Sequence, residues 1–392
     1  MTTTAEARST EAVPAKMRAA VLHQFNEPYQ VQNVDTPSAP EGHDLLVRVL
    51  AASYCHTDAV FASGAMSQAL PRVGCHEFAG RIVAMGPDVA SEALQLAVGV
   101  EVGVPGRPYH ACGACRECRR GAAPFCPHIL NLGLTTDGGF RDFALVDSRQ
   151  VAPLPSQPAP MTAVQAAPLM CAGLTVWSAL ELARTTHGAR KVAIMGAGGG
   201  LGHLAVQFAA HLDLAVLAVD AQDAALELLR AVVATLDAPA QARVTVADAR
   251  RLDVASALAG VGEQRADEGL LAGVDAVLLL PESQAAFNTG MQLLRNHGTM
   301  VVVSFPSRGF VLDAGDVVFR DIRVVGSLVG RNQQLRDMLA FAAAHGIAAV
   351  TRSFALEHIN DLVSESHRGA GGKLVIDMLA ELHSDYNSSG LR

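Results

Sequence analysis

The stretch Lys191-Val-Ala-Ile-Met-Gly-Ala-Gly-Gly-Gly-Leu-Gly202 decides the fold, because in it a short apolar strand runs into a glycine-rich turn. A helical apolar pattern follows at Leu201–Leu212, and a second apolar strand at Leu214–Val219 closes on Asp220. In such a turn one glycine permits the tight bend, a second lets the backbone approach a pyrophosphate, and a third lets the helix pack on the strand. The helix N-terminus adds free N–H groups and the positive end of its dipole. The stretch therefore predicts a dinucleotide-binding turn.

Asp220 favours one type of dinucleotide. It ends the next strand, 21 residues after Gly199. A carboxylate there accepts hydrogen bonds from the ribose hydroxyls of NAD and repels the 2′-phosphate of NADP. No basic residue follows closely, and we therefore expect NAD(H). The strict G-x-G-x-x-G frame is not met, since position 201 is leucine, so a purely structural glycine turn stays open as the alternative.

The rest of the 392-residue chain has two regions with different sequence patterns, as expected for two domains. From Met17 to about Asp147, short apolar strands are cut by glycine and proline, which predicts a β-rich domain with many turns. A proline-rich, linker-like segment follows at 151–160. Beyond it, strands alternate with helical segments, which predicts a parallel sheet with right-handed crossovers. The segment 231–273 does not resolve into clear elements.

Four of the seven cysteines lie within fifteen residues, in the pattern C-x2-C-x2-C-x7-C. Four thiolates this close can surround one metal ion, and an all-thiolate set of four is typical of a closed, tetrahedral, structural zinc site. An iron–sulfur site is the alternative in principle. A single loop of this spacing beside a β-rich domain fits zinc better, with the ligands Cys112, Cys115, Cys118 and Cys126.

A second set of metal-binding residue types is dispersed along the chain. It consists of Cys55, which begins Cys-His-Thr-Asp, His76 in Gly-Cys-His-Glu, and Cys171 before Ala-Gly-Leu-Thr. Two thiolates and one imidazole leave a fourth position open for water or substrate, which is the composition of a catalytic zinc site. A lone histidine beside apolar residues is more often a satisfied polar group, so the prediction depends on all three contexts together.

The order of these motifs resembles the zinc-containing medium-chain alcohol dehydrogenases. The resemblance runs from about Met17 to Met378, and the microbial branch is the most similar, on the strength of LMCAGLTVWSAL at 169–180, MGAGGGLGHLAVQFA at 195–209 and VVGSLVG at 324–330. It implies an α/β two-domain fold: a GroES-like β-rich catalytic domain and a Rossmann domain with a doubly wound parallel sheet. The expected limits are 17–172 and 328–380 for the catalytic domain and 173–327 for the NAD-binding domain, with flexible tails at 1–16 and 381–392.

The resemblance also implies the site residues. Two zinc ions per chain and NAD(H) are the expected cofactors. His56 and Lys373 match positions that contact the pyrophosphate in relatives, although Lys373 also fits a merely solvated charge. The full expected coenzyme set is His56, Gly196, Gly198, Gly199, Gly200, Leu201, Gly202, Asp220 and Lys373.

Three residues near the dispersed ligands have expected catalytic roles in such an enzyme. Thr57 is the candidate first hydroxyl of the proton path. Asp58 is the candidate acceptor that orients His76. Glu77, beside that histidine, is expected to approach the metal transiently. Zinc would act as a Lewis acid on the alcohol oxygen.

The chain departs from the family pattern at several positions. Val60 stands where many relatives have the histidine that ends the proton relay, and Ala225 where a lysine is frequent. Cys75 stands where glycine is frequent, so it is either a small buried residue or a redox group beside the zinc. The only tryptophan is Trp177, while Met66 and Phe305 stand near pocket positions. From Val60 we expect slower or differently pH-dependent alcohol oxidation, or a working preference for aldehyde reduction. The missing tryptophans indicate a substrate other than ethanol, such as a larger or aromatic aldehyde.

The main hypothesis is a zinc-dependent oxidoreductase that interconverts an alcohol and its aldehyde or ketone by hydride transfer with NAD(H). One alternative is a biosynthetic aldehyde reductase with a larger or aromatic substrate. The alternative from another class is a catalytically weak NAD-binding sensor or structural oligomer, towards which only Val60 points. A quinone-reductase-like member is disfavoured, because that branch lacks these cysteines.

Composition limits the remaining partners. The formal net charge is −8 and no basic cluster is interleaved with aromatic residues, so we expect no nucleic-acid partner. The apolar runs are too short to span a bilayer, and residues 1–16 have no apolar signal-peptide core, so we expect no membrane partner and a cytoplasmic location. The expected partner is a small alcohol or aldehyde, and the resemblance implies a homodimer or homotetramer.

Overall fold

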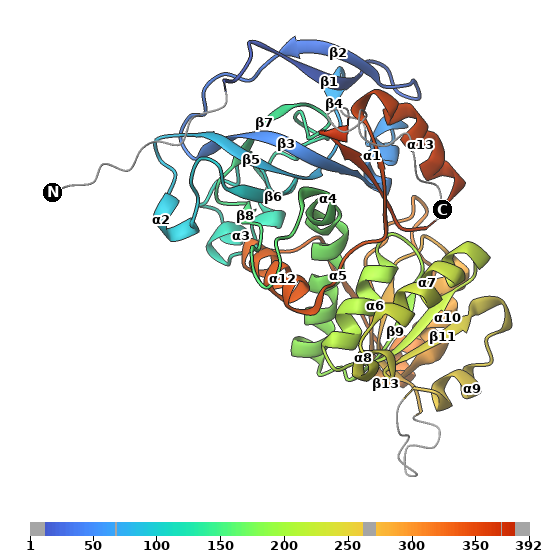
Figure 1. Cartoon of the computed structure of the whole chain (residues 1–392). Coiled ribbons are helices and arrows are strands. Elements are labelled where there is room, and N and C mark those ends of the chain that lie inside the picture. The colour runs from blue at the N-terminus through green and yellow to red at the C-terminus, as the bar shows by residue number, and fades with distance from the viewer. Residues whose placement is uncertain (1–11, 67–68, 262–271, 370, 381–392) are drawn as a thin grey trace.

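The computed structural model describes residues 12–66, 69–261, 272–369 and 371–380. Two parts that differ in secondary structure lie side by side (Figure 1). The upper one is rich in β-strands, most of them from the first half of the chain and two from near its C-terminal end, and the lower one alternates strands and helices. Residues 381–392 of the expected tails, and residues 1–11, lie outside the described residues.

The β-rich part consists of two sheets, which confirms the GroES-like fold expected for it. A three-stranded antiparallel sheet has the order β2-β1-β4, and a seven-stranded sheet has the order β15-β16-β3-β5-β6-β8, with β7 also paired to β3. The strands are β1 (Lys16–Leu22), β2 (Gln30–Asp35), β3 (Asp44–Tyr54), β4 (Arg72–Val73), β5 (Glu77–Met85), β6 (Glu101–Pro105), β7 (Phe143–Asp147), β8 (Ala152–Pro153), β15 (Thr351–Phe354) and β16 (Lys373–Asp377).

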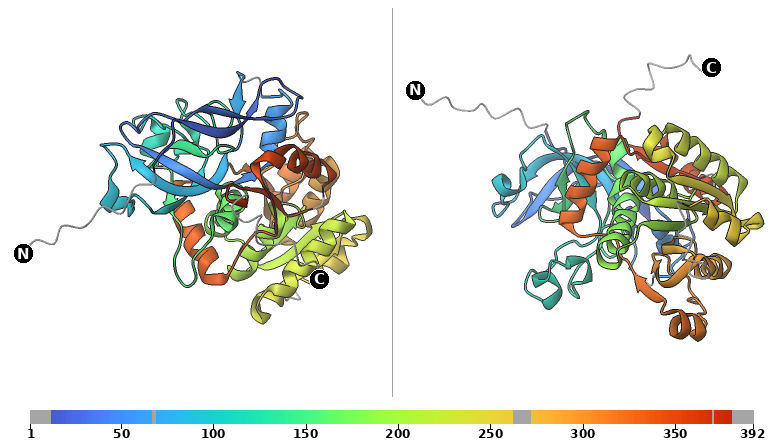
Figure 2. Two further views of the ribbon diagram at one scale, coloured as in Figure 1. Left: turned by 45° about the horizontal axis from the view of Figure 1, so that its top comes forward. Right: turned by 90° about the horizontal axis from the view of Figure 1, so that it is seen from below.

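This part of the chain also contains helices. They are α1 (His56–Ala62), α2 (Ser91–Leu94), α3 (Arg116–Arg119), α4 (Ala163–Ala166) and α13 (Ile359–Arg368). The teal segment around α3 projects from the body (Figure 2, right). Part of the predicted linker is not a free connection, because β8 pairs with β6.

The second part is a six-stranded parallel sheet of order β11-β10-β9-β12-β13-β14, the Rossmann topology that strand–helix alternation predicted. Its strands are β9 (Lys191–Met195), β10 (Ala215–Asp220), β11 (Val244–Asp248), β12 (Val274–Leu279), β13 (Leu294–Val302) and β14 (Arg323–Gly326). Its helices are α5 (Ala172–Glu181), α6 (Gly202–His211), α7 (Asp223–Thr235), α8 (Ala238–Gln241), α9 (Val254–Ala259), α10 (Gln284–Leu293), α11 (Ala314–Arg320) and α12 (Asn332–His345).

Both faces of the parallel sheet are buried, because helices cover each of them. Alternate residues of β9 show this directly. Val192 and Ile194 pack with α5, α6 and α12, whereas Ala193 and Met195 pack with α10 on the other face. A strand buried on both faces has a continuous apolar run, as parallel strands do. The segment 231–273 resolves into the end of α7, then α8, β11 and α9, while its residues 262–271 lie outside the described residues.

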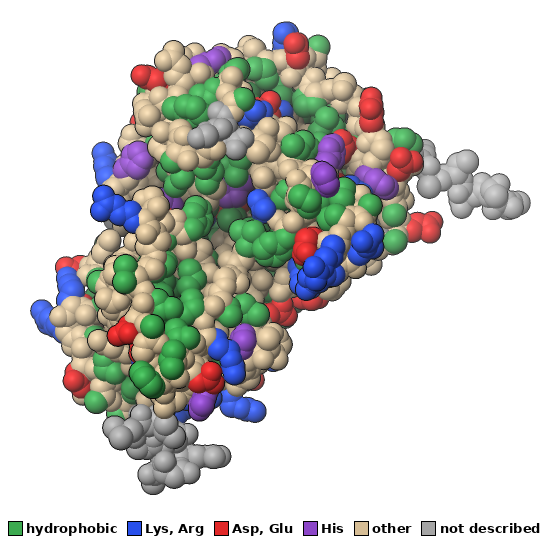
Figure 3. Space-filling model, turned by 180° about the vertical axis from the view of Figure 1, so that it is seen from behind, with side chains coloured by type: hydrophobic (Ala, Val, Ile, Leu, Met, Phe, Trp, Pro, Cys, Tyr) green, Lys and Arg blue, Asp and Glu red, His purple; other side chains and the backbone are tan. Residues whose placement is uncertain are grey.

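Within the part of the chain that the structure describes, no single helix is long and apolar enough to cross a membrane. The bent pair Ala163–Met170 and Ala172–Thr186 passes that test together, by length and composition only. Most of the α5 side chains in this pair are buried in the core of the protein. The face seen from behind carries a patch of hydrophobic side chains in its lower half and a hollow where the two parts meet (Figure 3).

Candidate active site

The glycine-rich turn joins β9 to α6, as its sequence predicted. Gly196 has a φ of 76°, in the left-handed region that favours glycine. A Cβ atom on Gly198 would collide with the backbone of Ala225 on α7, and one on Gly202 with the carbonyl of Gly196. The turn therefore needs small residues at these positions in order to pack against α7 and upon itself.

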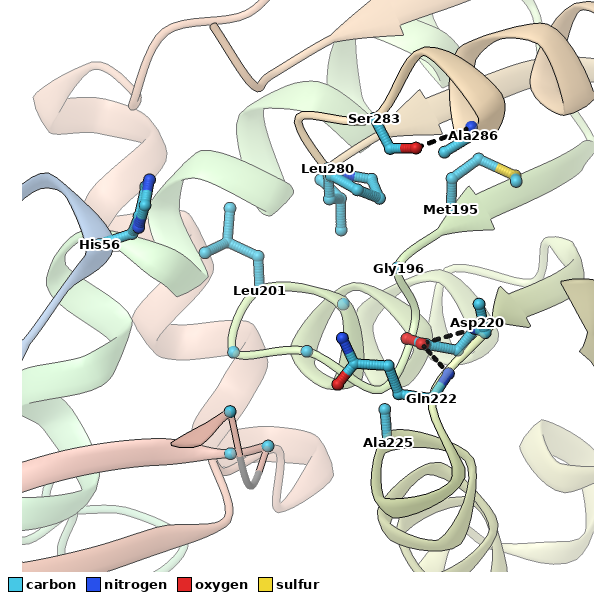
Figure 4. A pocket seen from close by; sticks show the side chains of 18 of the residues that line it. His56, Met195, Gly196, Leu201, Asp220, Gln222, Ala225, Leu280, Ser283 and Ala286 are labelled. Atoms are coloured by element: carbon cyan, nitrogen blue, oxygen red, sulfur yellow. Dashed lines mark hydrogen bonds between the residues drawn. The ribbon is translucent and has the colours of Figure 1, made fainter. Parts of the chain in front are cut away.

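A cleft of about 750 Å³ opens in front of this turn. Figure 4 shows Gly196, Leu201, Asp220 and Ala225 around it, with His56 at its far side. The other coenzyme positions expected from the sequence that line the cleft are Gly199, Gly200, Gly202 and Lys373. Cys55 also lines it, so one cleft connects the glycine turn with a predicted metal ligand.

The Asp220 carboxylate lies at the end of β10, at the rim of the cleft. It accepts the backbone N–H of Gly198 at 2.9 Å, of Ala221 at 2.8 Å and of Gln222 at 3.2 Å. These amides orient the carboxylate and oppose its charge, so it is held in place for an additional hydrogen-bond donor. Its predicted role, binding of the ribose hydroxyls, stays a prediction that this position supports.

His203 is a residue of the turn region that the sequence analysis missed. Val350 donates its N–H to Nε2 of His203 at 3.1 Å, so Nδ1 carries the proton and donates to the carbonyl of Gly199 at 2.8 Å. Burial lowers the pKa of His203 to about 4, which keeps the imidazole neutral. A histidine on an otherwise apolar helix was its only signal in the sequence. It joins the glycine turn to the segment before β15.

The structure brings the dispersed metal-binding residues together. Cys55 lies between β3 and α1, His76 precedes β5, and Cys171 precedes α5, yet their ligand atoms all lie within 4.8 Å of one another. Nε2 of His76 is buried and has no hydrogen-bond partner. A hydrogen bond from the Cys171 thiol lowers the pKa of Cys55, which favours its thiolate. A buried imidazole nitrogen without a partner, beside two sulfur atoms, fits a zinc ion as the missing partner.

Asp58 holds this group in position from α1. Its buried carboxylate accepts the backbone N–H of Cys55 at 2.9 Å and of Cys75 at 3.2 Å, and it lies 3.1 Å from Nδ1 of His76. With Nδ1 bound to a carboxylate, Nε2 is the nitrogen that faces the two sulfur atoms. This is the orienting contact that metal-binding histidines have in general.

Glu77 and Lys373 form a buried ion pair beneath the same group. The Glu77 carboxylate accepts hydrogen bonds from Nζ of Lys373, from Oγ of Ser53 at 2.7 Å and from the N–H of Ala172 at 3.4 Å. Nζ of Lys373 also donates to the carbonyl of Tyr54 at 3.0 Å. Although burial lowers it, the Glu77 charge raises the pKa of Lys373 above its ordinary value, so the ammonium stays charged.

These contacts change one sequence interpretation. Lys373 is only 5% exposed, so the interpretation of this residue as a solvated surface charge is wrong. Lys373 lines the cleft, and its ammonium group donates to Glu77. The predicted contact of Lys373 with a pyrophosphate and the predicted approach of Glu77 to the metal both remain predictions, and each would require the ion pair to rearrange.

His56 lines the cleft at the start of α1, and Thr57 is the next residue of that helix. The His56 side chain is exposed, and its Nε2 lies 3.5 Å from the Glu282 carboxylate, which follows β12 on the opposite wall. Oγ1 of Thr57 lies 3.8 Å from the sulfur of Cys55. Thr57 is therefore close enough to the candidate metal site to contact a molecule bound there.

The expected substrate-pocket positions are not brought to the cleft. Met66 packs against the apolar core of the β-rich part, and Phe305 is largely exposed to solvent. Trp177 is buried against Phe208 and Phe341. Trp177 is therefore a core residue in the second part of the protein.

The four-cysteine loop has the geometry of a second metal site. The sulfur of Cys112 lies 3.6 Å from that of Cys126 and 4.0 Å from that of Cys118, and all four sulfur atoms lie within 4.8 Å of one another. Four sulfur ligands at about 2.3 Å from a tetrahedral zinc ion lie about 3.8 Å apart. Backbone N–H groups of Cys115 and Cys118 donate to sulfur atoms of the set, which favours thiolates.

Cys75 is the seventh cysteine and belongs to neither set. It is fully buried, and its thiol donates to the carbonyls of Ser53 and Glu77. Burial raises the pKa of Cys75, so the thiol stays protonated. Its φ of 78° explains why glycine suits this position. These features favour the interpretation as a small buried residue over a redox role.

Comparison with known proteins agrees with this geometry. The alcohol dehydrogenase GroES-like domain family matches residues 41–156, and the zinc-binding dehydrogenase family matches residues 200–344. An alcohol dehydrogenase of Geobacillus stearothermophilus is 32% identical over 92% of this chain and 99% of that protein. One from Moraxella sp. (strain TAE123) is 33% identical with the same coverage. The crystal structure of the alcohol dehydrogenase from the archaeon Aeropyrum pernix matches with a TM-score of 0.77 and 29% identity, over 92% of this chain and 99% of that one.

Proposed function

The chain belongs to the zinc-containing medium-chain alcohol dehydrogenase family, and we propose that it interconverts an alcohol and its aldehyde or ketone by hydride transfer with NAD(H). The observation that carries this proposal is the single cleft that is lined by the glycine turn and Asp220 as well as by Cys55. A coenzyme bound along the turn and a substrate bound at the cysteine end would meet inside it.

Different residues of the chain would have different roles in this reaction. Cys55, His76 and Cys171 would hold one zinc ion, and the four-cysteine loop a second, structural one. When bound, the catalytic zinc polarises the carbon–oxygen bond of the substrate, and the nicotinamide donates or accepts the hydride. Asp58 fixes the orientation of His76. Thr57, whose Oγ1 lies 3.8 Å from the sulfur of Cys55, would accept or donate the hydroxyl proton of the substrate.

The coenzyme would be NAD(H) rather than NADP(H). Asp220 supports this choice, because its fixed carboxylate at the rim of the cleft would repel a 2′-phosphate. His56, Gly196, Gly198, Gly199, Gly200, Leu201 and Gly202 would surround the pyrophosphate.

Two measurements test the proposal together. We expect close to two zinc ions per chain and oxidation of NADH, faster than that of NADPH, with at least one member of an aldehyde panel. Cys171→Ser should lose one zinc ion and the activity, whereas the matched variant Cys75→Ser should keep both. One zinc ion per chain and no turnover with any aldehyde or alcohol would contradict the proposal and favour the sensor alternative.

Val60 favours a second candidate, a dedicated aldehyde reductase. It lies on α1, one helical turn from Thr57, and its aliphatic side chain cannot pass on a proton. The proton would then leave from Thr57 through water or the ribose hydroxyl. Comparison of the rates of alcohol oxidation and aldehyde reduction at one pH distinguishes the two directions.

We also propose that two copies associate along β14. Among the described strands, β14 ends the parallel sheet, so one of its edges is open for pairing. The adjoining α11 carries Phe319, 86% exposed, and Val318, 70% exposed. Figure 3 shows hydrophobic side chains gathered on the face seen from behind. Such a patch beside an open edge is typical of a subunit interface.

The cytoplasm is the proposed compartment, because six cysteines lie in thiolate sets that require reduced sulfur.

A further inference from the structure

Arg250 is a basic residue that lines the cleft on the side of Asp220, although it lies on the next strand of the sheet. Strands β10 and β11 are parallel neighbours in which Asp220 pairs with Asp248, so both carboxylates lie at the same edge of the sheet. Arg250 follows directly after the end of β11. In a dinucleotide-binding fold, the acidic residue at the position of Asp220 binds the ribose of the adenosine half. Arg250 is therefore placed beside the adenosine of a bound coenzyme.

Two carboxylates hold the Arg250 guanidinium in place. Its Nε donates to Oδ1 of Asp248 at 2.9 Å, and its Nη2 donates to Oδ2 of Asp248 at 2.8 Å and to Oδ1 of Asp223 at 2.5 Å. A guanidinium has five N–H donors, and these contacts use the three on Nε and Nη2. The donors on Nη1 have no hydrogen-bond partner within the described part of the chain. They remain available to a molecule in the cleft.

The other side chains at this end of the cleft offer few donors to an adenosine. Ala225 is the α7 residue that lines the cleft, and its methyl group forms no hydrogen bond. Figure 4 shows it close to Gln222 and Asp220. Asp220 as a carboxylate only accepts hydrogen bonds. Arg250 thus adds a charged donor next to the acceptor that Asp220 provides.

A phosphate would find no such partner in Arg250. Arginine binds phosphate through two parallel N–H groups, and each such pair on a guanidinium includes a hydrogen of Nη2. Asp248 and Asp223 already accept both of these hydrogens. Hydrogen bonds from Arg250 lower the pKa of Asp248 to about 2, so this carboxylate stays charged. With Asp220, three carboxylates face the guanidinium groups of Arg250 and Arg251, and the surroundings repel an added negative charge.

We propose that Arg250 binds the adenosine half of NAD(H), and that Asp223 and Asp248 restrict it to the coenzyme without a 2′-phosphate. The proposal rests on the dehydrogenase function proposed above and extends the choice of coenzyme beyond Asp220. Nη1 of Arg250 would donate to the adenosine, whereas the two carboxylates occupy the donors that a 2′-phosphate would require.

Two nucleotides without a nicotinamide test the proposal without turnover. The experiment measures binding of AMP and of adenosine 2′,5′-bisphosphate to the zinc-loaded full chain by isothermal titration calorimetry, and we expect the wild-type chain to bind AMP more tightly. Arg250→Gln should bind AMP about tenfold more weakly, the effect of one charge-assisted hydrogen bond. Asp223→Asn should narrow the preference for AMP by about two- to fivefold, because it removes a negative charge and releases one hydrogen of Nη2.

Arg243→Gln and Asp213→Asn are the matched controls, because these two residues form an ion pair of 2.6 Å in the same part of the protein and do not line the cleft. Both should bind the two nucleotides as the wild-type chain does. Equal AMP affinity of the wild-type chain and Arg250→Gln, or an unchanged preference in Asp223→Asn, would overturn the proposal even if the chain oxidises NADH with aldehydes. AMP binding that depends on Arg250 in a chain without turnover would support it and contradict the dehydrogenase function alone.

Discussion

Replacement of Asp58 with asparagine should release zinc from the Cys55–His76–Cys171 set and leave the four-cysteine set loaded. The carboxylate accepts two backbone N–H groups and contacts Nδ1 of His76. An asparagine side chain has one oxygen and one NH2 group, so in either orientation its NH2 group faces at least one of these donors. The imidazole then loses the charged acceptor that orients it.

The magnitude follows from these contacts. Loss of the acceptor of a metal-binding histidine typically lowers metal affinity 10- to 100-fold, which corresponds to about 1.4–2.8 kcal/mol. A buried N–H group left without an acceptor costs a further ~1–3 kcal/mol in the free energy of unfolding. Both changes arise from one fully buried side chain.

The assay measures zinc released at graded chelator concentrations, in which two sites of different affinity give two phases. We expect the weaker phase of Asp58→Asn to shift 10- to 100-fold and the other phase to stay in place. Asp275→Asn is the matched control, because Asp275 likewise accepts two backbone N–H groups, from Arg190 and Lys191, but lies away from both metal sets. Equal zinc release from the two variants, or a shift of both phases, would refute the reasoning.

Four further outcomes are expected. In the unfolded chain His203 titrates near its ordinary pKa of 6.5, and in the folded chain near 4, so the folded state loses about 3 kcal/mol of stability as the pH falls through this interval. His203→Gln should flatten that dependence in denaturant unfolding measured from pH 7 to pH 4. Cys75→Gly should change the free energy of unfolding by less than about 1 kcal/mol, because relief of the left-handed backbone offsets the lost thiol contacts, and a larger loss in thermal or denaturant unfolding would contradict this. Glu282→Gln removes a negative charge 3.5 Å from Nε2 of His56, the residue expected to contact the coenzyme pyrophosphate. Because that charge repels the pyrophosphate, NADH should bind the variant roughly two- to fivefold more tightly at low salt. Unchanged affinity in a fluorescence titration would exclude the effect. Phe319→Asp should shift the chain to a smaller assembly in light scattering, and an unchanged mass would exclude the β14 interface.

The sequence alone was sufficient wherever a function depends on residues close together in the chain. The four cysteines lie in one loop, so their spacing already determines that the sulfur atoms can meet around one ion. The glycine turn, its strand and its helix are likewise contiguous. The alternation of strands and helices predicted the parallel sheet. The individual strands could be recognised because they are buried on both faces and therefore have continuous apolar runs.

Local patterns were insufficient where the signal was weak. Strand β11 was missed because its five residues are only partly buried and include Thr245 and Asp248, so it has no apolar run. The left-handed conformation of Cys75 has no signal in the identity of the residue itself. It became clear only once the backbone between Gly74 and His76 was placed.

The cysteines and histidines predicted as ligands were properties of the sequence, but their surroundings were decided by tertiary structure. Lys373 and Glu77 are 296 residues apart, and the pairing of their side chains changes the expectation for both. Nε2 of His203 accepts the backbone N–H of Val350, 147 residues further along the chain. The imidazole rings of His211 and His345 lie 4.7 Å apart, centre to centre, where the ends of two helices converge. Hydrogen bonds and ion pairs act over a few ångströms in space, irrespective of separation along the chain, so these partners could be identified only after the chain had folded.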